Sequence, residues 1–117
     1  MTVRQTIHDK VAERLAVYQQ AALAIHAHPE TSNHEYFAQE TLTKLLADEG
    51  FAVTKDVASH PTGFTAVYKS AKPGPVIVFL AEYDALAGIG HACGHNLFGA
   101  TSSLAGTALK AVIDEVG

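Results

Sequence analysis

The chain has 117 residues, of which 48% are hydrophobic and 17% are charged, and its formal net charge is -4. This composition is typical of one globular domain, and the acidic balance argues against binding to nucleic acid or to an anionic membrane surface. The longest apolar run, residues 76–81, is too short to cross a bilayer, and the polar first residues lack the apolar core of a secretory signal. The single cysteine, Cys93, cannot form an internal disulfide, so we expect a reducing, cytoplasmic setting.

Two amphipathic helices are predicted in the first 50 residues. Apolar side chains recur in steps of three and four over residues 7–25, which predicts a helix that ends before Pro29. A second helix is predicted to follow Ser32, whose side chain would form a capping box with Glu35. Gly50 is suited to the turn that ends this helix.

The next part of the chain is predicted to form strands. Residues 51–57 and 64–69 have the pattern of two half-buried strands joined by a turn. Residues 76–81 are apolar without alternation, which predicts a central strand buried on both faces. A last helix, rich in small residues, is predicted from about residue 96 to about residue 116. We therefore expect an α/β fold that is the N-terminal part of a mixed-sheet α/β sandwich, with the sheet incomplete.

The strongest candidate for chemistry is the segment Gly-His-Ala-Cys-Gly-His-Asn at residues 90–96. Thiolate and imidazole are ligands that zinc prefers among protein groups. The two glycines disfavour a helix, and in a looped backbone Cys93 and His95 point the same way. A helical backbone would instead pair His91 with His95. The spacing therefore favours Cys93 and His95 as a metal-ligand pair.

Residue types and spacing leave other interpretations of these positions open. Cys93 could be a small buried side chain beside incidental histidines, or a nucleophile with a histidine base. His26 and His28 could form half of a metal site, but a helix terminus, where polar groups meet exposed carbonyls, is the interpretation we favour.

Two acidic residues follow the third predicted strand, at the edge of the sheet where open α/β folds bind ligands. Asp84 is either a solvated or helix-capping carboxylate, or a group that accepts a hydrogen bond from a ligating imidazole and fixes its tautomer. We favour the second interpretation for Asp84, and favour it less for Glu82. Tyr83, between them, is expected to point the opposite way.

Three short motifs follow one another along the chain: Ile-His-Ala-His-Pro-Glu at residues 25–30, Ala-Glu-Tyr-Asp-Ala-Leu at 81–86, and Gly-Ile-Gly-His-Ala-Cys-Gly-His-Asn at 88–96. In this order and spacing they resemble the amidohydrolase branch of the aminoacylase and carboxypeptidase-G-type zinc metallopeptidases. That branch includes hippurate hydrolase, aminobenzoyl-glutamate hydrolase and dipeptidase-like enzymes. The resemblance covers nearly all of the chain after the first helix.

The resemblance implies roles for individual residues. It assigns Cys93 and His95 as ligands of a divalent metal, with zinc as the first expectation and manganese as the alternative. Asp84 would belong to the catalytic centre, where it orients a ligand. The resemblance carries no ligand role to Glu82 or His91. Residues 1–117 would then form the N-terminal part of a metallopeptidase catalytic domain.

The activity implied is hydrolysis of N-acyl amino acids, dipeptides or related small amides. In such proteins the general-base glutamate, the remaining ligands and a dimerising lid domain would lie beyond residue 117, so we expect the chain alone to be inactive. The alternative is a non-catalytic fragment or subunit that needs a C-terminal portion, a second copy or a complementing chain. Two departures from the family pattern are Asn96 in place of aspartate and Ala87 in place of proline, and Asn96 is closest to the aminobenzoyl-glutamate and dipeptidase-like subgroups.

Overall fold

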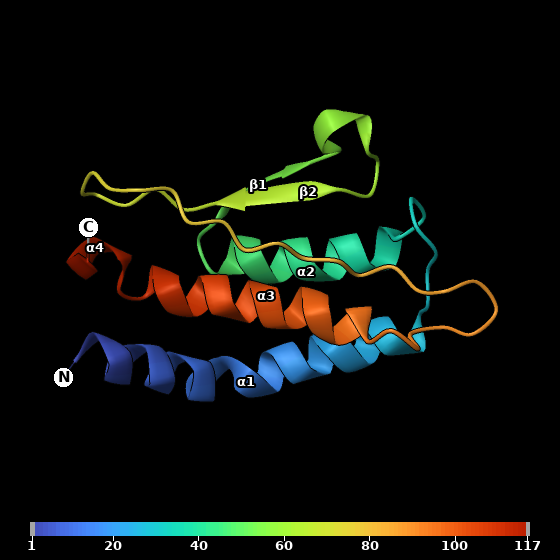
Figure 1. Cartoon of the computed structure of the whole chain (residues 1–117), viewed down its shortest axis with the longest axis horizontal. Coiled ribbons are helices and arrows are strands. Elements are labelled where there is room, and N and C mark those ends of the chain that lie inside the picture. The colour runs from blue at the N-terminus through green and yellow to red at the C-terminus, as the bar shows by residue number, and fades with distance from the viewer. Residues whose placement is uncertain (1, 117) are drawn as a thin grey trace.

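The computed structural model describes residues 2–116, and helices and a short hairpin make up its framework (Figure 1). The elements in chain order are α1 (Val3–Ala27), α2 (Tyr36–Asp48), β1 (Ala52–Lys55), a 3-10 turn (Val57–Ser59), β2 (Phe64–Val67), α3 (His95–Lys110) and α4 (Ile113–Val116). Helix α3 lies between α1 and α2 in Figure 1, and the hairpin lies over α2. The expected mixed α/β class, with an incomplete sheet, is confirmed.

Helix α1 extends beyond the core at its N-terminal end. Its first turn is closed by a capping box, in which Gln5 N–H donates to Thr2 Oγ1 at 3.1 Å and Thr2 N–H donates to Gln5 Oε1 at 3.0 Å. The helix ends two residues before Pro29, as predicted. Its buried side chains all lie in the second half and pack toward α3: Tyr18, Ala21, Ala22 and Ile25.

The predicted start of α2 is wrong. The helix begins at Tyr36, with Glu35 at the N-cap, and no side chain makes a cap hydrogen bond from that position. The carboxylate of Glu30 instead accepts the N–H groups of Phe37 at 2.8 Å and Ala38 at 3.0 Å. These are two of the donors that every helix start leaves without an internal partner, so Ser32 is not needed as a cap.

The predicted end of α2 is confirmed. Gly50 has a φ of +95° and its N–H donates to the carbonyl of Ala47 at 3.0 Å. The N–H of Phe51 donates to the carbonyl of Leu46, also at 3.0 Å. This pair of hydrogen bonds is a Schellman motif, whose left-handed residue is best filled by glycine.

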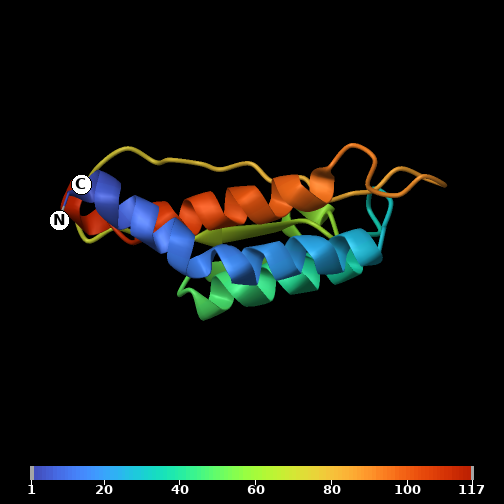
Figure 2. The same cartoon turned by 90° about the horizontal axis from the view of Figure 1, so that it is seen from below.

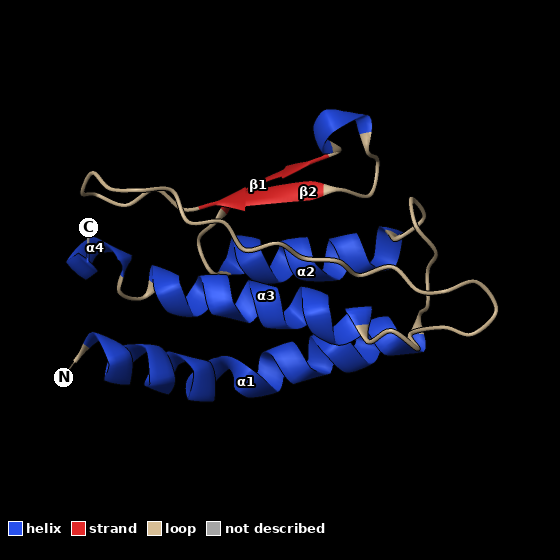
Figure 3. Cartoon of the chain, viewed as in Figure 1, coloured by secondary structure: helices blue, strands red, loops and turns tan. Residues whose placement is uncertain are grey.

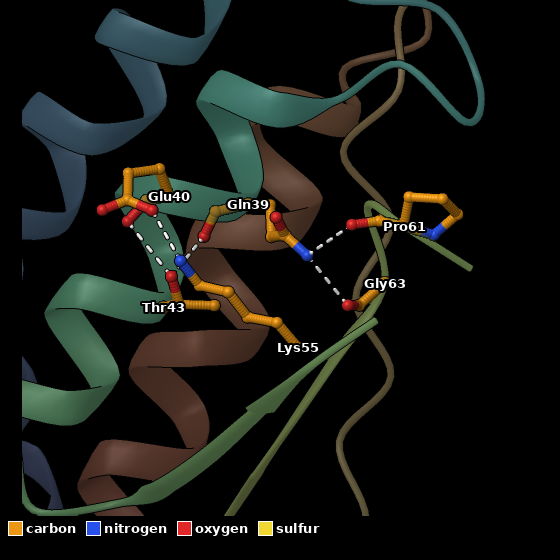
Figure 4. A network of polar contacts seen from close by, with 6 residues as sticks. All are labelled: Gln39, Glu40, Thr43, Lys55, Pro61 and Gly63. Carbon is orange, nitrogen blue, oxygen red and sulfur yellow. Dashed lines mark hydrogen bonds and ion pairs between the residues drawn. The ribbon is translucent and has the colours of Figure 1, made fainter. Parts of the chain in front are cut away.

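Strands β1 and β2 pair antiparallel, with Ala52 opposite Val67 and Lys55 opposite Phe64. Both are shorter than predicted but lie within the predicted ranges. Figure 4 shows how the hairpin is fastened to α2. Gln39 Nε2 donates to the carbonyls of Pro61 at 3.1 Å and Gly63 at 2.9 Å, and an ion pair of 2.6 Å joins Lys55 Nζ to Glu40 Oε2.

The predicted third strand is wrong in its burial. Residues 76–81 are extended, but the structure assigns no strand there and the segment is drawn as loop in Figure 3. The side chains of residues 76–80 are exposed, and the segment runs along the outside of the molecule, away from α2 (Figure 2). A buried strand needs paired neighbours and cover on both faces, and the two assigned strands of residues 2–116 pair with each other.

The core closes around the side chains of Ile25, Ala38, Leu42 and Tyr83. Helix α3 approaches this core at Gly99, where an added Cβ would lie 3.0 Å from Leu42 Cδ1 and 3.3 Å from the carbonyl oxygen of Glu82. This close contact brings the backbone of residues 82 and 83 against the first turns of α3. Within residues 2–116, none of the helices combines the length and apolar character needed to cross a bilayer.

Candidate metal centre

One imidazole lies between two carboxylates at the end of α3 nearest the long loop. His95 Nδ1 is 2.8 Å from Asp84 Oδ1, and His95 Nε2 is 3.1 Å from Glu82 Oε2. One ligand atom from each of these three residues lies within 4.8 Å of the other two. Glu82 is exposed, whereas Asp84 and His95 are partly buried. The cluster is therefore accessible to an ion or a small molecule from solvent.

The extended backbone of residues 82–84 places both carboxylates on one side. Side chains two apart in an extended chain point the same way, so Glu82 and Asp84 face His95 together. Tyr83 points to the other side, as expected, where it is buried and its hydroxyl donates to the carbonyl of Thr62 at 2.5 Å. Burial raises the pKa of Tyr83 to about 12, so this hydroxyl keeps its proton at neutral pH.

The start of α3 fixes the position of the imidazole. His95 is the first residue of the helix, and Gly94 precedes it as N-cap with a left-handed φ of +78°. The ring of Phe98 packs edge-on against the His95 ring, with 5.9 Å between centroids. Asn96 is buried and its side-chain N–H donates to the carbonyl of Ala22 at 3.2 Å, which joins the start of α3 to α1.

Asn96 is one of the two departures noted in the sequence, and this contact gives it a physical reason. An amide nitrogen can donate to a carbonyl, but an ionised aspartate can only accept. Aspartate at this position would leave the carbonyl of Ala22 without this donor and would place a charge in a buried site.

Cys93 lies in the turn before α3, where it is exposed and forms no disulfide. It is not part of the group of three that the described residues bring together. Its role as a metal ligand stays a prediction, as does that of His95.

The remaining histidines of the motifs lie around the end of α1. His91 stacks against His26 with 6.2 Å between ring centroids, and burial, together with the neighbouring His26 and His95, lowers the pKa of His91. His28 Nδ1 lies 3.0 Å from the carbonyl of Ala24, in the last turn of the helix. This contact fits the helix-terminus interpretation favoured for His26 and His28.

The donor set suits a divalent cation. A neutral imidazole has one N–H, so His95 can donate to Asp84 or to Glu82 but not to both. With Nδ1–H directed to Asp84, the lone pair of Nε2 faces a carboxylate oxygen, an arrangement that a cation between them would relieve. Ligand atoms that share one tetrahedral zinc at about 2.0–2.1 Å lie about 3.3 Å apart, close to the 3.1 Å between Nε2 and Glu82 Oε2.

Sequence reasoning gave too little weight to Glu82. The signal that could have found it was the alternation of an extended chain, which already placed Tyr83 on the far side and therefore places residues 82 and 84 together. Glu30 was also missed as a contact of this region, because its carbonyl accepts the N–H of Ala85 at 2.6 Å across more than fifty residues.

Curated proteins related to this chain are amide-bond hydrolases by name. A p-aminobenzoyl-glutamate hydrolase of Escherichia coli is 35% identical over 95% of this chain. A Homo sapiens Xaa-Arg dipeptidase is 37% identical over 91%, and a Bacillus subtilis N-acetylcysteine deacetylase is 33% identical over 73%. This chain belongs to their amidohydrolase family.

The family assignment from the three motifs is therefore confirmed. The chain spans about a quarter of the length of these amidohydrolases, with 26%, 26% and 25% of each relative covered. No protein-family model matches the chain.

Proposed function

We propose that this chain forms part of the catalytic centre of a metal-dependent amide hydrolase that acts on N-acyl amino acids, dipeptides or related small amides. The observation that carries the proposal is the position of His95 between Asp84 and Glu82, at an exposed edge beside the Cys93 turn. The names of the relatives support the substrate class, because an aminobenzoyl-glutamate, a dipeptide and an N-acetyl amino acid each contain an amide bond.

The ligands in this proposal are Cys93 and His95, with zinc as the metal or manganese as the alternative. Asp84 accepts the Nδ1 proton of His95 and so keeps the Nε2 lone pair free for a cation. When bound, a divalent cation lowers the pKa of a water molecule and polarises an amide carbonyl. The free thiol of Cys93 suits a reducing, cytoplasmic location, which is part of the proposal.

The proposed site is a partial one. A catalytic zinc is held by three protein ligands and an open position, and Cys93 and His95 supply two. We propose that the other ligand and the general base come from outside residues 1–117, either from a longer polypeptide or from a complementing chain or second copy. The alternative is that this chain is a non-catalytic subunit, and the exposed edge of residues 76–81 favours some form of pairing.

Metal titration of the purified chain tests the proposal. Co²⁺ replaces zinc and gives a sulfur-to-metal absorption band when a thiolate is a ligand, so we expect this band in the parent chain and its loss in Cys93→Ser. A matched control is His60→Gln, which changes a histidine in the exposed hairpin turn. Absence of any metal-dependent change in the parent chain would overturn the proposed metal site.

Hydrolysis separates the two forms of the proposal. Zinc-loaded chain is assayed against a dipeptide and an N-acyl amino acid, alone and with a chain covering the rest of a family-length amidohydrolase. Activity that appears only on complementation, and is lost with Cys93→Ser, supports the partial site. Metal binding without activity in either mixture supports the non-catalytic subunit.

A further inference from the structure

The backbone that carries Asp84 is held on both sides by segments distant in sequence. On one side, the Tyr83 hydroxyl donates to the carbonyl of Thr62, and the Thr62 hydroxyl donates to Glu35 Oε1 at 2.8 Å. On the other side, the N–H of Ala85 donates to the carbonyl of Glu30 at 2.6 Å. Asp84 therefore sits in a three-residue segment whose two outer members are fixed by separate contacts.

Glu30 joins this segment to the beginning of α2. Its backbone carbonyl accepts from Ala85, while its two carboxylate oxygens accept from Phe37 and Ala38. Helix N-termini carry a partial positive charge, so an ionised carboxylate is held there by charge as well as by hydrogen bonds. Because the side chain is fixed at α2, the carbonyl of the same residue has a defined position against Ala85.

Thr31 to Glu35, between Glu30 and α2, adds no comparable support. These residues lie mostly at the surface and Asn33 has a left-handed φ of +67°. The carboxylate of Glu30 spans this loop and determines where the backbone of Glu30 lies relative to α2.

We propose that Glu30 is a positioning residue for the Asp84–His95 pair, acting through the hydrogen bond from Ala85. The inference rests on the proposed function only in treating that pair as part of a metal centre. Glu30 touches neither carboxylate of the cluster; it sets the path of the backbone beside Asp84. With Glu30 released from α2, the Ala85 hydrogen bond weakens and Asp84 no longer holds the Nδ1 proton of His95 in one place.

The test compares Glu30→Gln with Thr2→Ala in the metal-free chain. Glutamine keeps the size of the side chain but replaces one acceptor oxygen with an amide that cannot accept from a backbone N–H. Thr2→Ala removes the cap of α1 at the other end of the molecule, so it matches the loss of a helix cap without touching the cluster (Figure 1). Ring ¹⁵N shifts give the tautomer of His95, and amide hydrogen exchange reports on Ala85.

We expect the parent chain and Thr2→Ala to keep the Nδ1–H tautomer of His95 and a protected Ala85 amide. Glu30→Gln should lose the dominance of that tautomer, and its Ala85 amide should exchange at least about tenfold faster. Equal tautomer populations and equal Ala85 protection in the two variants would overturn the proposal. If Glu30→Gln does not fold, Glu30→Asp, with both carboxylate oxygens on a shorter stem, gives the same comparison with a smaller effect.

Zinc is added to each sample after these measurements. A failure of the parent chain to show zinc-dependent shifts at His95 counts against the proposed metal centre alone. The effect of Glu30 on the apo tautomer is judged from the metal-free spectra, so the two results are independent.

Discussion

At the residue scale, the hydrogen bond between Asp84 and His95 decides which ring nitrogen is free. A carboxylate on Nδ1 holds the proton there and raises the basicity of the opposite nitrogen. The same contact limits rotation of the ring, which Phe98 also restricts from the side. A single carboxylate therefore controls both the tautomer and the direction of the imidazole.

Replacing Asp84 with asparagine should weaken metal binding. The side chain keeps an oxygen that accepts from Nδ1 but loses its charge, and we expect zinc affinity to fall about 10–100-fold, as for other carboxylates behind a ligating histidine. Competition with a chromophoric chelator measures the affinity. Asp114→Asn is the matched control, because Asp114 also accepts a backbone N–H but lies far from the cluster. Equal affinities of the two variants would contradict the role of Asp84.

A buried tyrosine gives the protein a predictable response to alkaline pH. The hydroxyl groups of Tyr18 and Thr107 share a hydrogen bond of 2.9 Å between α1 and α3, and burial raises the pKa of Tyr18 above 10.0. Because the folded-state pKa is the higher one, the stabilisation from Tyr18 is complete below pH 10.0 and is lost as pH rises above it.

Tyr18→Phe should lower the free energy of unfolding by about 0.5–1.5 kcal/mol at neutral pH, because Thr107 loses its partner. Above pH 10.0 the parent chain loses stability as Tyr18 ionises on unfolding, whereas the variant does not, so the difference should shrink. Urea denaturation at both pH values measures it. Tyr83 is present in both chains and cancels. A difference that grows with pH would contradict the assignment.

At the element scale, α3 depends on a glycine where it crosses the core. Gly99 faces Leu42 and the backbone of residues 82 and 83 at distances that leave no room for a methyl group. Gly106, two turns later on the same helix, has only ordinary contacts at 3.8 Å and 3.9 Å around its added Cβ position. The helix therefore needs glycine at one of these positions and not at the other.

Gly99→Ala and Gly106→Ala should change stability in opposite directions. Overpacking at Gly99 should lower the free energy of unfolding by about 1–3 kcal/mol. Alanine at Gly106 should raise it by up to about 1 kcal/mol, through its higher helix propensity. Urea denaturation of both variants measures the two effects. Destabilisation of equal size at both positions would show that the contact at Gly99 is not the cause.

The sequence predicted those features that depend on local pattern. The apolar periodicity located α1 and α2, and Gly50 located the end of α2. The start of α2 could not be found, because its cap, Glu30, reaches across a loop from outside the helix. Burial of residues 76–81 could not be judged, because it depends on neighbouring strands and not on the apolar run itself. The position of Asp84 beside His95 was expected, since a strand end and a helix start commonly meet at such an edge.

At the scale of the whole molecule, residues 76–80 form an exposed apolar edge. Val76, Val78 and Leu80 are 87%, 70% and 75% exposed, whereas Ile77 and Phe79 are 55% and 44% exposed. The alternation shows that one side of the segment leans toward the molecule and the other faces solvent. An extended apolar segment without paired neighbours is a template for association with another chain.

Val78→Lys should reduce self-association of the chain. A charge on the outward side opposes edge pairing, and at an exposed position it should change the free energy of unfolding by less than about 0.5 kcal/mol. Size-exclusion chromatography with light scattering measures the association state. Leu23→Lys is the matched control, since Leu23 is 65% exposed on α1, away from this edge. Identical behaviour of the two variants would show that residues 76–80 are not the associating surface.

The direction of α3 has a consequence for how further side chains could reach the cluster. From His95 to Lys110 the helix runs about 22 Å away from it. A strand that followed the helix and returned beside residues 76–81 would lie parallel to them, as a right-handed crossover, and would need about seven residues for the distance. Such a strand would shield the apolar edge and, by the same path, deliver its carboxyl end next to Glu82 and Asp84.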